Sequence, residues 1–226
     1  MSLIWIIFIG ISLLSWIVQA NLNRKFKKFS EIPVGGGMTG RDVAERMLQA
    51  HGIHDVKTTC IEGRLTDHYN PADNTVNLSR EVYSSCSVAA AAVAAHECGH
   101  AVQHATAYGP LKMRSALVPA VSFASKWVSW IMLAGIMVVE RFPGLLLFGI
   151  LLFATTTLFS FITLPVEINA SQRALAWLDR SGVTSSYNQR DAESALRSAA
   201  YTYVVAALSS LATLVYYVMI YLGRRD

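Results

Sequence analysis

Four long apolar runs set the hydrophobic pattern of this chain. They are Leu3 to Ala20, Ala116 to Val139, Leu145 to Pro165 and Tyr201 to Leu222. Each run is long enough to cross about 30 Å of hydrocarbon as a helix, although Lys126 interrupts the second one. Only 15% of the residues are charged, against about a quarter in average soluble chains. The pattern predicts an integral membrane α-helical protein with about four transmembrane helices.

The first run has two interpretations. Val18, Gln19 and Ala20 resemble a signal-peptide cleavage site, but no basic residues precede the apolar stretch. A basic cluster instead follows it, over residues 24–28. This order favours an uncleaved anchor, with the next segment in the cytoplasm.

The distribution of Lys and Arg supports that orientation. Residues 24–114 hold eleven and residues 166–200 hold four, while the opposite side holds only Arg141, Arg224 and Arg225. Fifteen against three fits the positive-inside rule. We therefore interpret the net charge of +4 as membrane orientation and expect no nucleic-acid partner.

The spans divide the chain into five segments. We expect an N-terminal transmembrane anchor over 1–23, a cytoplasmic α+β domain over 24–115, a transmembrane hairpin over 116–165, returning cytoplasmic helices over 166–200, and a last transmembrane helix with its tail over 201–226. Pro165 suits the start of the returning helices.

The α+β domain shows a helix pattern followed by strand patterns. Thr39 to Ala50 predicts a helix capped by Thr39, and Asp55 to Cys60 and Thr75 to Leu78 alternate like short strands. Turn-forming residues fill 67–74. The strand at 74–79 either offers its edge to an extended peptide or is a plain edge strand.

The main chemical motif is His96-Glu97-Cys98-Gly99-His100, at the end of an alanine-rich run that predicts a helix capped by Ser87. Histidines four apart share a helix face, so His96 and His100 can bind one metal ion. Glu97 can then hold a water as general base without ligating the metal. The alternative is two histidines on the polar edge of a surface helix.

Two neighbours of the motif have less specific roles. Cys98 points to the opposite side of the helix and is expected to be a small packed thiol. Together with Cys60 and Cys86 it forms an odd set with no paired spacing, expected to be reduced. We expect the helix to continue past the site over residues 101–115. In it, His104 follows His100 by one turn and is either a group supporting the ligands or an exposed histidine.

Catalytic zinc usually takes three protein ligands, so a third is needed. Two spans separate His100 from residue 166, so the segment after the hairpin returns to the side of the histidines. Its acidic candidates are Glu167, Asp179, Asp191 and Glu193. We favour Glu167, which lies closest to the end of a span, with Glu193 second. Otherwise Glu167 only stabilises a helix N-terminus.

Several motifs together closely resemble the YugP-type neutral zinc metallopeptidases of bacterial membranes. They are Asp67–Pro71, Val76–Ser79, Val93–His104, and Leu164–Glu167 with Ala170 and Ser171. More distantly, the chain resembles the HtpX-type and CaaX-type membrane zinc proteases. The resemblance implies a small gluzincin-like protease domain and a bacterial inner membrane location, multi-pass, with the site facing the cytoplasm.

The resemblance also implies roles for particular residues. His96, His100 and Glu167 would be the zinc ligands, with Glu97 as catalytic base. HtpX-like proteins carry an aspartate four residues after the ligand glutamate, where this chain has Ser171. A carboxylate is therefore not available to support the ligands at that position.

These observations lead to one main hypothesis, a zinc-dependent endopeptidase of the membrane. Zinc would lower the pKa of its water to about 7, and Glu97 would take the proton as a peptide carbonyl is attacked. The candidates for stabilising the oxyanion are His68, Tyr69 and Arg173. The expected partners are the lipid bilayer and a polypeptide substrate, membrane proteins included.

Two other classes of function stay open. A catalytically silent membrane scaffold would hold a structural zinc closed by a fourth ligand, from His104 or Asp179. A channel or transporter would explain Lys126 inside a span, although Lys126 beside Trp127 also suits the membrane interface.

Overall fold

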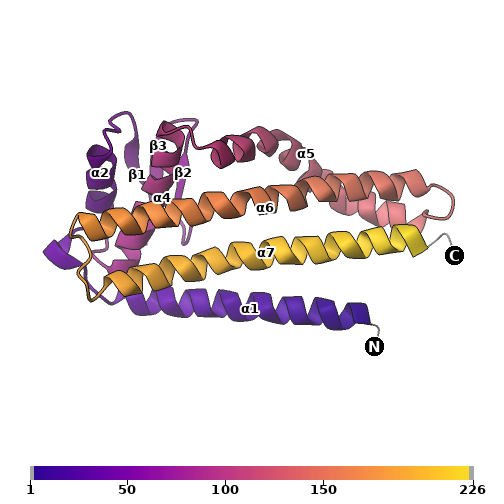
Figure 1. The fold of residues 1–226 in the computed structure, drawn as a ribbon, viewed down its shortest axis with the longest axis horizontal. Helices are drawn as coiled ribbons and strands as arrows, with labels where there is room; N and C mark the ends of the chain where they lie inside the picture. Colours follow the sequence, from indigo (N-terminus) through magenta and orange to yellow (C-terminus); the bar gives the residue numbers. More distant parts are fainter. Residues whose placement is uncertain (1–2, 224–226) are drawn as a thin grey trace. The chain divides into compact units, whose positions relative to one another are not determined.

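The computed structural model describes residues 3–223 and is dominated by four long helices (Figure 1). They are α1 (Leu3–Ser30), α5 (Gly109–Met137), α6 (Pro143–Arg180) and α7 (Gln189–Gly223). Within the described residues these four are long and apolar enough to cross a membrane. The prediction of a mostly helical fold with four candidate membrane helices is confirmed. Arg224 and Arg225, counted above for orientation, lie outside the described residues.

The chain forms two compact units, and the long helices contribute to both. In the described range, the first unit comprises residues 3–16, 112–165 and 202–223. The second comprises residues 17–111 and 166–201. The histidine motif and Glu167 both belong to the second unit, so the candidate site can be described within that unit alone.

In the first unit, α5 and α6 make a close hairpin. A Cβ on Gly135 of α5 would lie 2.7 Å from the Cα of Leu146 on α6, so the two backbones meet at this glycine. Met132 and Leu146 form a small core there with side chains of α7. The outer faces of these helices carry many large exposed apolar side chains, as a lipid-facing surface requires.

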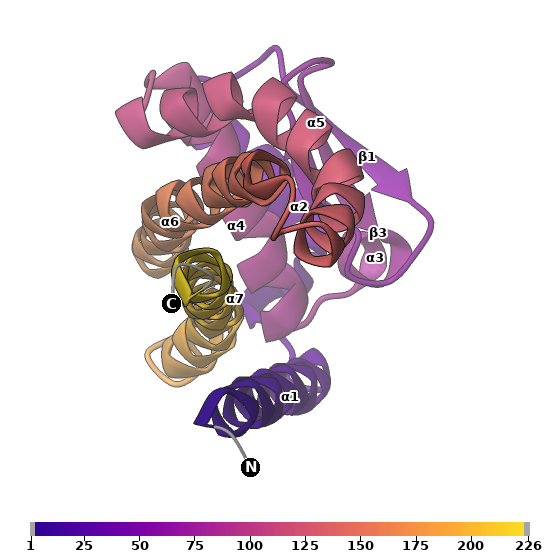
Figure 2. The ribbon, with the colours of Figure 1, turned by 90° about the vertical axis from the view of Figure 1, so that its right-hand side faces the viewer.

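In the second unit, three strands form a small mixed sheet in the order β1-β3-β2. Strand β1 (Lys57–Ile61) pairs parallel with β3 (Thr75–Ser79), with Lys57 opposite Thr75. Strand β2 (His68–Asn70) pairs antiparallel with β3, with Tyr69 opposite Val76. Figure 2 shows β1 and β3 beside α3 (Arg80–Ser84), which follows β3 along the chain.

The core of the second unit surrounds α4 (Val88–Ala105). Ser87 caps this helix by accepting a hydrogen bond from Ala90 N, as predicted. Residues 88–95 are all buried, because small alanine side chains let neighbouring elements pack on every side of the helix. One neighbour is α2 (Gly40–Ala50), whose predicted cap, Thr39, is also present. The others include β3 and the part of α6 after Glu167.

Three local expectations are wrong. Strand β3 is the central strand of the sheet and β2 occupies its edge, so residues 74–79 offer no free edge. Residues 68–70, expected to be a turn, form β2, because the turn-forming residues act only from Pro71 onward. The third is the prediction of where two helices, α4 and α6, end or begin.

Helix α4 ends at Ala105, although the sequence predicts a helix past the site to residue 115. Ala107 adopts a left-handed φ of 53°, and Tyr108 N donates to Gln103 O, which is a Schellman-type ending. By contrast, α6 continues through Pro165, where a new helix was expected to start. A proline removes only one donor from the helix, and membrane helices tolerate that loss.

Candidate metal centre

The two histidines of the motif lie side by side on α4. Their ring centroids are 4.8 Å apart and the ring planes are nearly perpendicular, at 84°. This arrangement follows from the four-residue spacing, which places His96 and His100 on one helix face. His100 is buried and His96 is partly buried, so the pair sits in the protein and not on a solvated edge.

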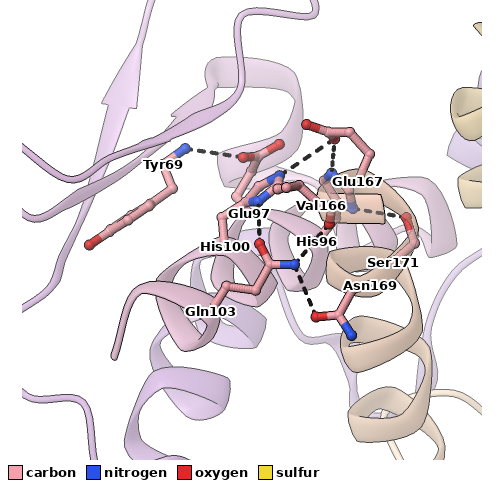
Figure 3. A network of polar contacts seen from close by, with 9 residues as sticks. All are labelled: Tyr69, His96, Glu97, His100, Gln103, Val166, Glu167, Asn169 and Ser171. Atoms are coloured by element: carbon pink, nitrogen blue, oxygen red, sulfur yellow. Dashed lines mark hydrogen bonds and ion pairs between the residues drawn. The ribbon is translucent and has the colours of Figure 1, made fainter. Parts of the chain in front are cut away.

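Glu167 of α6 brings its carboxylate to both rings (Figure 3). Its Oε2 is 3.2 Å from His96 Nε2 and 3.5 Å from His100 Nε2. One ligand atom from each residue lies within 4.8 Å of the other two, so the three side chains could hold a metal ion. Among the described residues, Asp179, Asp191 and Glu193 join no such group.

The approach of α6 to α4 depends on Gly99, inside the motif. A Cβ at this position would lie 2.6 Å from the backbone oxygen of Ala170 and 3.1 Å from its Cα. Any side chain on residue 99 would therefore push the helices apart. Because Ala170 follows Glu167 by less than one turn, this contact sets how far the Glu167 carboxylate reaches.

The far sides of both imidazoles also have hydrogen-bond partners. His96 Nδ1 is 3.1 Å from Ser171 Oγ, and His100 Nδ1 is 3.1 Å from Gln103 Oε1. Both Nε2 atoms are thereby turned toward Glu167. Ser171 was a candidate in the sequence, but Gln103 was missed; its only signal was its position three residues after His100.

Glu97 is buried on the same helix and faces a different neighbour. Its Oε2 accepts a hydrogen bond of 3.1 Å from the backbone N–H of Tyr69, on edge strand β2 (Figure 3). The carboxylate is not part of the group formed by His96, His100 and Glu167. This separation leaves Glu97 available for proton transfer.

Burial and charge act against each other at His100. Burial alone lowers its pKa. The hydrogen bond with Glu167 and the negative charges of Glu97 and Glu167 raise it, and the net direction is upward. The metal-free site is therefore one that favours a positive charge near these carboxylates.

The remaining sequence candidates are outside this group of three and have other contacts. His68 contacts Thr66 O through Nδ1 and Asn77 through Nε2. Tyr69 Oη is 3.1 Å from His104 Nδ1, and burial raises the pKa of this tyrosine, so its hydroxyl stays protonated.

Arg173 and Cys98 contact neighbouring residues of the same unit. Arg173 Nε donates to Asn169 Oδ1, and its guanidinium lies over the Tyr108 ring. Cys98 is fully buried and its thiol donates to Ala44 O, consistent with a packed thiol. All three cysteines are free.

Comparison with known proteins agrees with this geometry. The family model described as "Putative neutral zinc metallopeptidase" matches residues 4–222. The chain belongs to this family. It is also 40% identical over 213 residues to "Putative membrane protease YugP" of Bacillus subtilis (strain 168), covering 94% of each chain. No solved structure matches the chain.

Family membership confirms the resemblance seen in the sequence motifs. The family description names zinc, and the group of His96, His100 and Glu167 is a place where this chain could hold it. The similarity to a membrane protease, together with four apolar helices, establishes a membrane protein.

The contact at Gly99 gives a direct test of the packing. We expect Gly99→Ala to weaken zinc binding and lower stability by about 1–3 kcal/mol, because the added methyl meets the α6 backbone. Bound zinc and thermal unfolding of the purified protein measure both effects. Gly144→Ala is the matched control, since a Cβ at Gly144 meets nothing within 4 Å. Unchanged zinc binding in Gly99→Ala would show that the close contact is not required.

Proposed function

We propose that this protein is a membrane-embedded zinc endopeptidase, with His96, His100 and Glu167 as ligands and Glu97 as general base. The observation that carries the proposal is the spacing of the ligand atoms. Oε2 of Glu167 is 3.2 and 3.5 Å from the two Nε2 atoms. Tetrahedral zinc with bonds of about 2.0–2.1 Å separates its ligands by about 3.3 Å. These two separations match that spacing, and all three ligand atoms lie within 4.8 Å of one another.

The chemistry of the donor set favours a catalytic site over a structural one. Two imidazoles and one carboxylate leave a fourth position for water, as in catalytic zinc sites. When bound there, zinc would act as a Lewis acid and lower the pKa of that water to about 7. A structural site needs a fourth protein ligand, and no further His, Cys, Asp or Glu of residues 3–223 joins the group.

Glu97 has the position and surroundings of a general base. It follows His96 directly, is buried, and is oriented by the backbone N–H of Tyr69. In our proposal it takes the proton from the attacking water and passes it to the leaving amine. Ser171 would support His96. The hydroxyl of Tyr69, which contacts His104, is our candidate for contacting the reacting carbonyl.

The substrate we propose is an extended polypeptide pairing with β2. This strand is one of the two edges of the sheet, and Tyr69 directs its backbone N–H away from β3 and toward Glu97. A peptide added along this edge would gain main-chain hydrogen bonds and place its own amides beside Glu97. The sequence suggested residues 74–79, now β3, as the strand that pairs with a peptide. Because β3 is central, we assign that role to β2.

Glu97→Gln tests the base. We expect hydrolysis to fall by about 10²–10⁴-fold while bound zinc stays at the wild-type level, because the change removes a base and not a ligand. The measurement compares cleavage of a peptide library, prepared from a whole proteome, by zinc-loaded wild type and variant. Wild-type cleavage by Glu97→Gln would refute the mechanism, and absence of cleavage by zinc-loaded wild type would refute the peptidase.

Glu167→Ala tests the third ligand against its rival in the sequence. We expect this variant to lose most zinc at concentrations that saturate wild type, because two protein ligands bind zinc weakly. Glu167→Asp should fall between, since it shortens the reach by one methylene. Glu193→Ala is the matched control and should keep full zinc, because Glu193 is exposed and outside the group. Bound zinc is measured by metal analysis. Full zinc in Glu167→Ala together with loss of zinc in Glu193→Ala would show that Glu193 is the third ligand.

We further propose a multi-pass protein of the bacterial inner membrane whose site faces the cytoplasm, from the fifteen-to-three distribution of Lys and Arg. Cys60 is an exposed native reporter. The test uses spheroplasts that express the Cys86→Ala variant. In them, Cys60 should react with a membrane-impermeant maleimide only after the membrane is permeabilised. When Glu140→Cys is combined with Cys60→Ser in the same variant, the new cysteine at position 140 should react with the maleimide without permeabilisation. The opposite labelling pattern would reverse the orientation.

A further inference from the structure

We propose that Gln103 is a positioning residue whose single amide joins the two ligand-bearing helices, fixing the protonated nitrogen of His100 and the place of Glu167. The inference rests on the zinc site proposed above. Gln103 is 0% exposed, so its polar atoms can be satisfied only within the protein, and each bond it makes is directed at the metal ligands or their immediate neighbours.

The side chain uses both ends of its amide (Figure 3). Its Nε2 donates to the backbone oxygen of Val166 at 2.8 Å and to Asn169 Oδ1 at 3.0 Å. Its Oε1 is 3.1 Å from His100 Nδ1. Both donor hydrogens and the acceptor of the amide are therefore in use. The acceptor contacts His100 on the same helix, α4, and the donors contact acceptors on α6.

The orientation of this amide follows from its partners. A backbone carbonyl can only accept, so the end of Gln103 that faces Val166 must be the nitrogen. The oxygen then faces His100 Nδ1, and a carbonyl oxygen there requires that Nδ1 carry the hydrogen. In the neutral ring this leaves Nε2 with a free lone pair, directed at Glu167.

The same reasoning reaches Asn169. Arg173 Nε can only donate, at 2.8 Å, so the atom of Asn169 that it contacts must be the oxygen. That oxygen accepts from Gln103 as well. The network is thus fixed at one end by a backbone acceptor and at the other by a guanidinium donor.

Ser171 cannot do the same for His96. Its hydroxyl can donate or accept, so the contact of 3.1 Å with His96 Nδ1 does not fix which ring nitrogen is protonated. Gln103 also holds α6 on both sides of Glu167, at Val166 and at Asn169. A displacement of either helix would break a bond of a buried amide, which is costly.

Three full-length variants separate these functions. Gln103→Met keeps the volume and removes every hydrogen bond of the side chain. Gln103→Glu keeps an acceptor for His100 Nδ1 but loses both donors to α6. Val183→Ala is the control, a core truncation of the same unit at a residue that is 1% exposed and is not among the nine residues of the polar network drawn in Figure 3.

Zinc affinity is measured by competition with a fluorescent zinc chelator, alongside the melting temperature of the metal-free protein. We expect Gln103→Met to bind zinc at least tenfold more weakly, as is typical when a partner of a metal ligand is removed. Gln103→Glu should lie between Gln103→Met and wild type. Val183→Ala should lower the melting temperature and keep wild-type zinc affinity.

The imidazole N–H signals of zinc-loaded, ¹⁵N-histidine-labelled protein give the second readout. The slowly exchanging Nδ1–H of His100 should persist in Gln103→Glu and be lost in Gln103→Met. Wild-type zinc affinity in Gln103→Met overturns the inference, as does an equal loss of affinity in Val183→Ala, which would make the role structural. If wild type itself binds no zinc, the proposed function fails first.

Discussion

The site depends on one close contact, the passage of α6 over Gly99 of α4. Of the three residues that could hold a metal, two lie on one helix and the third lies on another, 71 residues away from His96 in the chain. A glutamate side chain spans only a short distance, so the two backbones must nearly touch. A Cβ at Gly99 would lie 2.6 Å from Ala170 O, and the contact therefore permits no side chain at all. Because Gly99 lies between the two histidines, the closest approach of the helices coincides with the ligands.

The residues around this contact are buried, and this constrains their polar groups. Buried polar atoms without partners are costly, yet metal ligands require polar atoms at this place. Ser171 and Gln103 meet the requirement by contacting the histidines on their far sides. Gln103 then passes its hydrogen bonds to Val166 and Asn169. The packing that brings Glu167 to the histidines thus also supplies the partners that orient them.

The sequence was sufficient to predict those features that depend on residues close together in the chain. The helix of His96 and His100, its cap at Ser87 and the face shared by both histidines follow from spacing within a few residues. Glu167 was favoured over Glu193 from the order of the spans alone. The uninterrupted course of α6 through Pro165 was not predictable, since the effect of a proline depends on its surroundings. Likewise β2 and the bonds of Gln103 depend on partners far along the chain, 63 residues away for Val166.

The two buried carboxylates explain both the attraction of a cation and the division of roles between them. Burial alone lowers the pKa of His100, but the hydrogen bond with Glu167 and the charges of Glu97 and Glu167 raise it. These surroundings therefore favour the positively charged form of His100. A divalent ion held by His96, His100 and Glu167 would also supply positive charge there, and its binding to the neutral imidazole would be coupled to proton release. Only Glu167 faces both Nε2 atoms, at 3.2 and 3.5 Å. Glu97 is held aside by Tyr69 N, so its negative charge favours the cation while its oxygens stay available to accept a proton.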